Sequence, residues 1–283
     1  MAIMKIRISY SILFLLLSGA LAAKQNSVEV LMDQDGNIYR TVKIGNQVWM
    51  AENLKVTHYR DGSAIPDVPD NDAWSKLMTG ALCWIENDSI QYKNVYGALY
   101  NYYAVVDRRK LSPIGWHIPT IDEWRMLEQY LGGKESAGGK MKDLASHLWK
   151  AIHPGADNSS GFSAVPAGGR GRLGSSSEAG YYATWWALTS QDEDFAWHWG
   201  LHPDRPNIRS NPGHKASGFS VRCVKDPGET EAVFLELASD RDIDFAQTIS
   251  GSRAVTGDRR TGPAMVYPSP LIAWRSSDGF PAR

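Results

Sequence analysis

The chain has 283 residues, of which 43% are hydrophobic and 22% are charged, a composition typical of a folded globular protein. Its 30 lysines and arginines nearly balance its 31 aspartates and glutamates, and the formal net charge is −1. This balance argues against binding driven by bulk positive charge, which is the mode expected of proteins that bind nucleic acid or anionic membranes.

The first residues have the pattern of an export signal. Lys5 and Arg7 precede an apolar run at residues 8–17, and the small residues Ala20 and Ala22 follow. This order is typical of a secretory signal peptide, and we expect cleavage after Ala22. An uncleaved anchor is the alternative, for which the apolar run is short. We therefore predict a signal peptide at residues 1–22, no membrane-spanning segment in the mature chain, and an extracellular, cell-surface or periplasmic location.

The only two cysteines of the chain are Cys83 and Cys223. In an oxidising compartment an even number of cysteines favours a disulfide, and we predict one between them. The alternative is two separately buried thiols, which pack like small apolar residues. Neither cysteine has another one at the spacing of zinc ligands, so no metal site is predicted.

An early β-hairpin is predicted from apolar residues that alternate with polar ones on either side of Gly45-Asn46, namely Val42, Ile44, Val48 and Met50.

Just before this hairpin, Asp33, Asp35 and Asn37 resemble the start of a calcium-binding loop. Gly36, however, is the fourth residue of that stretch where such a loop has glycine at the sixth, and no glutamate stands at the twelfth. We do not predict calcium binding here.

A helix is predicted to begin after Thr120, because Thr120 and Glu123 match a capping box and Trp124, Leu127 and Leu131 follow at helical spacing. His117 lies just before this helix, and we interpret it as a partly buried structural histidine rather than a ligand.

A second helix is predicted over residues 138–150, where Met141, Leu144, Ala145 and Leu148 share one helical face. Beyond it, short apolar segments separated by glycine and polar turns indicate β-strands.

Five motifs in this order resemble the Fibrobacter succinogenes major paralogous domain: "DGNIYRTVKIGNQVWMAENLKVTHYRDG", "YGALYNYYAVVD", "PIGWHIPTIDEWRMLEQYLGG", "GFSAVPAGGRG" and "SGFSVRCVKD". The resemblance covers about Asp33 to Asp226. That family is similar to the C-type-lectin-like and formylglycine-generating-enzyme-like fold, which implies an α+β domain with two helices flanking a small twisted antiparallel sheet. Its members are exported or surface proteins of bacteria with no established biochemical activity. We assign the domain to residues 28–226 and expect a poorly ordered C-terminal tail at residues 227–283.

The sequence gives little support to catalysis. Formylglycine-generating enzymes use closely spaced cysteines late in the domain, where this chain has only Cys223. There is no G-x-S-x-G or H-E-x-x-H motif, and "GGRGRLG" at residues 168–174 is predicted to be a surface turn rather than a phosphate loop. His198 and His202 lie on a predicted strand, where residues four apart are about 13 Å from each other, too far to share one zinc ion. We predict no enzyme activity, metal or cofactor.

In this fold the late strands and loops form the usual ligand face. Aromatic residues with interspersed arginine and asparagine are typical of contact hot spots. The candidate ligand-binding residues are Tyr181, Tyr182, Trp185, Trp197, Trp199, Arg205, Asn207 and Arg209, with Trp186 beside them. About half of the aromatic residues must face the core, and the sequence does not decide which. We predict an exported recognition or adhesion module that binds a glycan or a protein. The alternatives are a structural surface protein without a discrete ligand and a divergent enzyme of the formylglycine-generating type.

Overall fold

The computed structural model of the protein describes residues 30–177 and 179–228. The predicted signal peptide and the predicted tail beyond Gly228 lie outside the described residues. The chain divides into two units, Met1–Asp226 and Pro227–Arg283, and the fold described below is that of the first.

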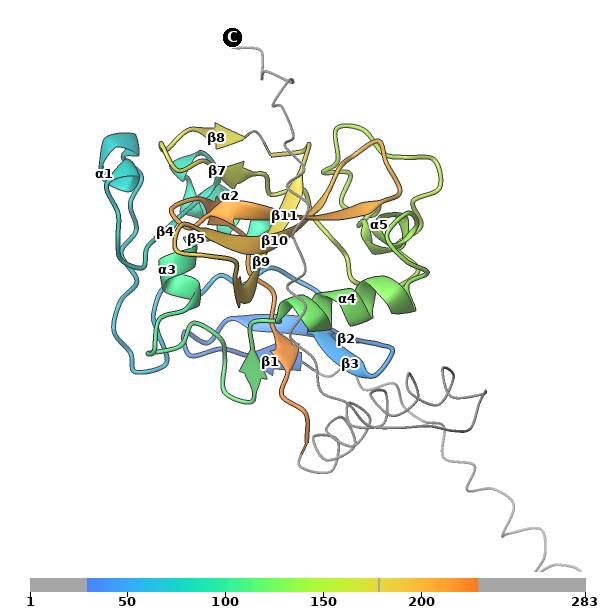
Figure 1. Ribbon diagram of the computed structural model, residues 1–283, viewed down its shortest axis with the longest axis horizontal. Helices are drawn as coiled ribbons and strands as arrows, with labels where there is room; N and C mark the ends of the chain where they lie inside the picture. Colours follow the sequence, from blue (N-terminus) through green and yellow to red (C-terminus); the bar gives the residue numbers. More distant parts are fainter. Residues whose placement is uncertain (1–29, 178, 229–283) are drawn as a thin grey trace, which may run out of the picture. The chain divides into compact units, whose positions relative to one another are not determined.

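Three antiparallel sheets make up most of the regular secondary structure of the described domain (Figure 1). The first has the order β1-β2-β3-β13-β6, formed by Val30–Met32, Ile38–Ile44, Gln47–Met50, Val224–Lys225 and Trp116–His117. The second has the order β11-β10-β9, formed by Ile208–His214, Phe195–Leu201 and Ala183–Ser190. The third has the order β4-β5-β12-β7-β8, formed by Leu82–Cys83, Leu99–Asn101, Gly218–Phe219, Gly169–Arg170 and Ser176–Ser177.

The helices are short. They are α1 (Asn71–Ser75), α2 (Ser89–Tyr96), α3 (Tyr102–Val105), α4 (Ile121–Tyr130) and α5 (Ala137–Met141), with a 3₁₀ turn at Ile85–Asn87. None of the helices in the described part of the chain has both the length and the apolar character needed to span a bilayer. The predicted fold class is wrong: the domain is mostly β, with three sheets, and not an α+β fold of C-type-lectin type in which two helices flank one small sheet.

Two local predictions are confirmed. Strands β2 and β3 form the early hairpin, with Val42 opposite Trp49. Helix α4 begins at Ile121, and both hydrogen bonds of the capping box between Thr120 and Glu123 are present. These two elements depend on interactions between residues close in sequence, which explains why the sequence predicts them.

The predicted second helix is wrong beyond Met141. Helix α5 ends there, and the backbone of the next residue, Lys142, forms a bridge with Ala164. The side chain of Lys142 is fully buried, and its ammonium group donates hydrogen bonds to the backbone carbonyl groups of Pro203 and Arg205. Burial lowers the pKa of Lys142 to about 8. A buried lysine that binds a distant loop overrides the apolar periodicity of this segment.

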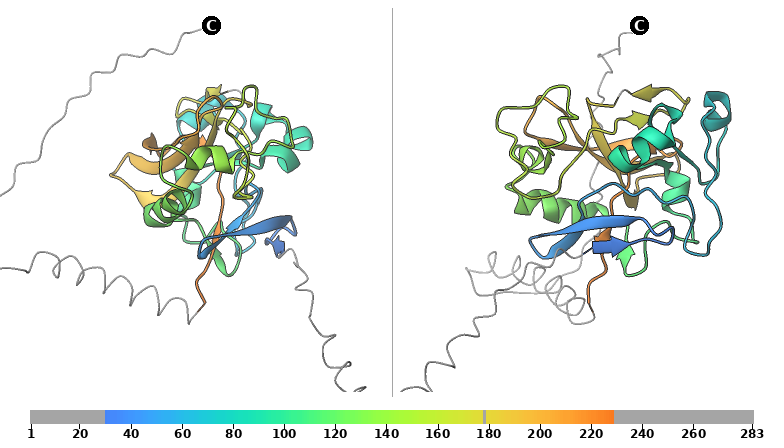
Figure 2. Two further views of the ribbon diagram at one scale, coloured as in Figure 1. Left: turned by 90° about the vertical axis from the view of Figure 1, so that its right-hand side faces the viewer. Right: turned by 180° about the vertical axis from the view of Figure 1, so that it is seen from behind.

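Neighbouring tryptophans of strand β9, in the central sheet β9–β11, are buried on opposite faces of the sheet. Trp185 and Trp199, paired across β9 and β10, pack into a core with Trp124 of α4 and Trp49 of β3. Trp186, the neighbour of Trp185, faces the opposite side and belongs to a second core. Figure 1 shows α4 between the β2–β3 hairpin and this sheet, and Figure 2 shows the same layers from two other directions.

The predicted disulfide is not present. Cys83 and Cys223 are free and buried, and they belong to different core clusters. Burial raises the pKa of the Cys83 thiol to about 11 and also raises that of Cys223. Both cysteines therefore act as small apolar core residues, the alternative that the sequence left open.

Candidate functional site

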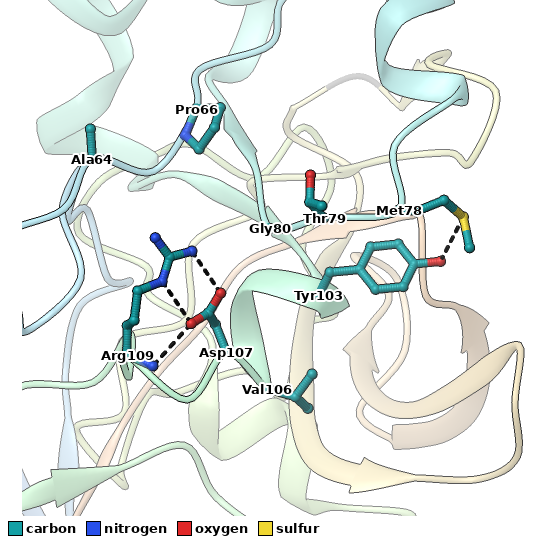
Figure 3. Close-up of a pocket in the computed structure, with 9 residues that line it drawn as sticks. All are labelled: Ala64, Pro66, Met78, Thr79, Gly80, Tyr103, Val106, Asp107 and Arg109. Carbon is teal, nitrogen blue, oxygen red and sulfur yellow. Dashed lines mark hydrogen bonds and ion pairs between the residues drawn. The ribbon is translucent and has the colours of Figure 1, made fainter.

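A hollow of about 430 Å³ opens beside helix α3 (Figure 3). We call it the Tyr103 hollow, and it is lined by Ala64, Pro66, Met78, Thr79, Gly80, Tyr103, Val106, Asp107 and Arg109. Its apolar wall is exposed: Met78 is 76% and Val106 48% accessible to solvent. The hydroxyl group of Tyr103 lies 3.7 Å from the sulfur atom of Met78, so the aromatic ring and the thioether form one continuous surface.

An ion pair closes one end of the hollow. Arg109 donates from Nε and Nη2 to the two carboxylate oxygens of Asp107, at 2.9 and 2.8 Å, and from Nη1 to the hydroxyl group of Ser63 at 3.0 Å. Its guanidinium group lies 4.0 Å from the ring centre of Tyr59. The hydrogen bonds from Arg109 hold the pKa of Asp107 below its usual range. Because Arg109 is fixed from several sides, little conformational entropy is lost if it contacts a ligand.

Two further hollows adjoin the same turn. Asp61, Asp107, Arg108 and Arg109 line one, and the other, of about 310 Å³, extends from Val106 and Asp107 to Trp116, His117 and Asp226. The turn at residues 106–110 is therefore bordered by three depressions. Sequence reasoning did not select it, although its run of charged residues directly after the apolar pair Val105-Val106 was a visible signal.

His117 lies between two carboxylates at the edge of the last of these hollows. Its Nδ1 atom is 2.7 Å from Asp226 and its Nε2 atom 2.7 Å from Glu123. Carboxylates accept hydrogen bonds, so both ring nitrogens carry a proton and the ring is an imidazolium. Burial disfavours this charge, but the two carboxylates outweigh it and raise the pKa of His117. His117 is therefore the partly buried, hydrogen-bonded histidine that we expected, and it ties Asp226 to the start of α4.

The comparisons with known proteins identify the family. The model of the Fibrobacter succinogenes major domain matches residues 42–225, well over half of the chain. The protein belongs to this family. The membership predicted from the five motifs is thus confirmed. Searches among curated proteins and among solved structures found no match.

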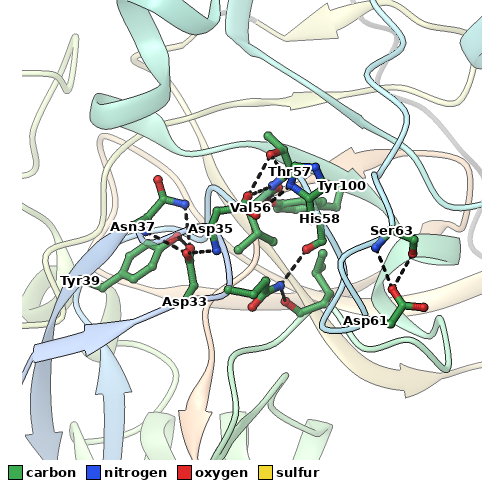
Figure 4. A network of polar contacts seen from close by, with 12 residues as sticks. Asp33, Asp35, Asn37, Tyr39, Val56, Thr57, His58, Asp61, Ser63 and Tyr100 are labelled. Atoms are coloured by element: carbon green, nitrogen blue, oxygen red, sulfur yellow. Dashed lines mark hydrogen bonds and ion pairs between the residues drawn. The ribbon is translucent and has the colours of Figure 1, made fainter.

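Several residues of the family motifs have structural roles. Figure 4 shows the start of the first motif, where buried Asp33, two residues before the motif, accepts hydrogen bonds from the backbone of Asp35, from Asn37 and from the hydroxyl group of Tyr39. Asp35 in turn accepts from the backbone and hydroxyl groups of Thr57. Burial opposes the charge of Asp35, but these hydrogen bonds outweigh it and lower its pKa. No group of three or more metal-ligating side chains occurs in residues 30–177 and 179–228.

The family motif "GFSAVPAGGRG" also contains a structural residue that sequence reasoning misplaced. Arg170 belongs to strand β7 and is 2% exposed, so the predicted surface turn is wrong at this position. A glycine-rich stretch does not reveal that one of its arginines is buried.

Three of the predicted ligand-binding tryptophans belong to the core of the family domain. Trp185 and Trp199 are buried, and half-buried Trp197 packs against the same cluster. Trp185 and Trp199 cannot contact a ligand, and their prediction is corrected here. Trp186, which the sequence also left undecided, is fully buried.

The remaining predicted residues are accessible. Tyr181 and Tyr182 are each 40% exposed, Arg205 and Arg209 are exposed, and Asn207 is half-buried. The structure links two of them, because the ring of Tyr182 contacts His202, whose Nδ1 atom binds Asp204, and Asp204 is 3.6 Å from Arg205. Arg209 lies on β11, opposite Gly200 of β10. None of these residues lines the Tyr103 hollow.

The His117 bridge should make stability depend on pH. Because the folded-state pKa of His117 is raised, its contribution is full below about pH 6.5, the unfolded value, and is lost as pH rises through the folded pKa. Glu123 has a lowered pKa, since its bonds to His117 and Thr120 outweigh burial, so its contribution is present above about pH 4.3 and is lost as pH falls.

Between about pH 6 and pH 9, wild type should therefore lose more of its unfolding free energy than His117→Gln does. Urea denaturation across this pH range measures both proteins. Parallel curves for the two would contradict the imidazolium assignment.

Proposed function

We propose that the domain is an exported, non-catalytic recognition module that binds a glycan or a protein in the Tyr103 hollow. The observation that carries this proposal is the combination of exposed Met78 and Val106 with a tyrosine ring and a fixed Arg109–Asp107 pair in one hollow. Binding sites commonly combine an apolar surface with a few oriented polar groups. Exposed apolar clusters of this kind mark contact sites on soluble proteins.

The thiol chemistry of the formylglycine-generating alternative finds no support. That chemistry needs reactive, closely spaced cysteines. Cys83 and Cys223 are instead buried in different core clusters, and burial raises the pKa of both thiols. The structural alternative, a surface protein without a discrete ligand, gives no reason for exposed Met78 and Val106 to border the same depression.

The first experiment searches for the ligand. The full chain, purified from the exported fraction of its host, is applied to an array of neutral, amino and acidic oligosaccharides, and is used to capture binding partners from an extracellular protein fraction. We expect the exported protein to begin at Ala23 and to bind at least one array or protein component. Recovery of the protein in the cytosol with an intact Met1 terminus would contradict export. Failure to bind in both screens would favour the structural alternative.

The second experiment places the ligand. Met78→Ala and Tyr103→Ala should each weaken binding of the component found in the screen by about tenfold, because side chains central to a contact contribute most of the affinity. Tyr181→Ala removes an exposed tyrosine outside the hollow and should leave the affinity unchanged. Titration calorimetry measures the affinities, and urea denaturation confirms that the variants are folded. Loss of binding in Tyr181→Ala alone would move the site to the surface predicted from the sequence.

A further inference from the structure

A separate groove of about 220 Å³ lies between the end of the β2–β3 hairpin and the last turn of α2. Its walls come from residues 51–55, 93–97, 143–148 and 163–165, and Arg222 lies at its base. We call it the Lys55 groove. It shares no lining residue with the Tyr103 hollow. Its volume is below that of sites for drug-sized molecules, about 300–1,000 Å³, and suits a ligand near the size of one sugar ring.

The lining of the groove has an excess of positive charge. Arg40, Lys55, Lys93 and Arg222 are its cations, and Glu52 and Asp143 are its anions. Glu52 is committed to Arg40 through an ion pair of 2.8 Å. Asp143 accepts a hydrogen bond from the backbone of Ala145. Lys55, Lys93 and Arg222 therefore have one unpaired acidic side chain, Asp143, to balance them.

Arg222 is a buried cation that contacts neutral oxygen atoms. It is fully buried, and its guanidinium group donates to the side chain of Asn53 and to the carbonyl groups of Met50, Phe162 and Ser163. Burial lowers its pKa to about 9. A buried charge without an ionic partner is costly, and an anion in the adjoining groove would offset part of that cost.

Two lysines, Lys55 and Lys93, line the groove. The ammonium group of Lys55 donates to Asn94 at 3.2 Å and lies 5.3 Å from the ring centre of Tyr39. Lys93 lies 5.9 Å from the ring centre of Trp84. Both side chains are half-buried, and among the described residues neither contacts a carboxylate. Their remaining ammonium protons are available to a ligand.

We propose that the Lys55 groove binds a carboxylate-bearing sugar, a hexuronate, with its carboxylate at Lys55 and Lys93. The other lining groups suit hydroxyl groups: Asn94 and Ser146 can donate and accept, and Asp143 can accept. Val95 and Leu148 offer apolar surface to the ring of the sugar. An acidic peptide shares the carboxylate but has no ring of hydroxyl groups to match this set of side chains, and it is the competing outcome of the test below. This site goes beyond the proposed function, because it lies apart from the Tyr103 hollow.

Titration calorimetry of the full chain with glucuronate, glucose and an acetylated triglutamate peptide tests the proposal. We expect glucuronate to bind at least about tenfold more tightly than glucose, which lacks the carboxylate, and more weakly as salt increases. Equal binding of glucose and glucuronate would overturn the carboxylate assignment. Absence of glucuronate binding at about 10 mM would overturn the site. If the peptide binds and glucuronate does not, the assignment to a sugar is overturned and the groove is assigned to acidic peptides.

Variants locate the site. Lys55→Gln and Lys93→Gln should each weaken glucuronate binding by about tenfold, the loss of one charge-assisted contact. Lys76→Gln, at an exposed lysine outside the groove, should bind like wild type. These lysines are used because substitution of fully buried Arg222 disturbs folding. Unchanged binding in both groove variants would contradict the proposal, whereas variants of the Tyr103 hollow should not affect glucuronate.

Discussion

Replacing Trp124 by alanine should lower the free energy of unfolding by about 3–5 kcal/mol, among the largest effects of any single core substitution. The indole of Trp124 is fully buried and stacks on Trp199, with ring centres 5.6 Å apart and planes 9° from parallel. It also contacts Trp49, Phe162 and Trp185. Its loss leaves a cavity where helix α4, the early hairpin and the central sheet meet. Urea denaturation followed by far-UV circular dichroism measures the change.

Two further variants of α4 make this prediction specific. Trp124→Phe should cost clearly less than alanine, because a phenyl ring fills much of the space and the buried Nε1 atom of Trp124 has no hydrogen-bond partner among the described residues to lose. Met126→Ala, at a 43% exposed position on the same helix, should change stability by no more than about 0.5 kcal/mol. Similar losses for Met126→Ala and Trp124→Ala would mean that the helix, rather than the aromatic cluster, determines the effect.

The sequence predicted elements whose determinants are local. The capping box at Thr120 and the turn at Gly45-Asn46 each involve residues a few positions apart, and both are present. The family followed from ordered motifs and is confirmed. The fold class did not follow, because the three sheets are built from strands distant in sequence: β13 pairs with β3 and β6, and β12 with β5 and β7. Several of these strands have two residues, too few for a pattern to detect.

The prediction of a ligand-binding face that includes Trp185 and Trp199 was wrong for a related reason. Alternation along β9 places Trp185 and Trp186 on opposite sides, and a sheet with one solvated face would expose one of them. Here both faces of the sheet are covered around these two tryptophans, by α4 and β3 on one side and by residues such as Tyr102 on the other. Burial of both tryptophans is a property of the assembled layers. Tyr181 and Tyr182 remain accessible because they precede the strand.

The candidate site was missed because it is assembled from separate loops. Tyr103 belongs to the second family motif, but Met78 and Arg109 lie outside all five, and the proximity of the three depends on the packing of α3 against the segment that precedes β4. In the second groove, Lys55 belongs to the first motif and Lys93 to none. Other motif residues, such as Asp35 and Arg222, bind the protein's own backbone or side chains. A motif alone therefore does not separate the residues that build the fold from those that line a hollow.

Replacing Arg170 by methionine should lower the free energy of unfolding by about 3–5 kcal/mol, as expected when one member of a buried polar network is removed. Arg170 donates to the carbonyl groups of Val68, Pro69 and Gly174 and to the side chain of Asn71, and its substitution leaves these acceptors unsatisfied. Arg170→Lys keeps the charge but lacks the planar set of donors, so it should fall between methionine and wild type. The matched control is Arg172→Met, at an exposed arginine two residues along the chain, which should change stability by no more than about 0.5 kcal/mol. Urea denaturation of the three variants decides the matter: equal stabilities for Arg170→Met and Arg172→Met would show that the buried guanidinium group does not hold these loops together.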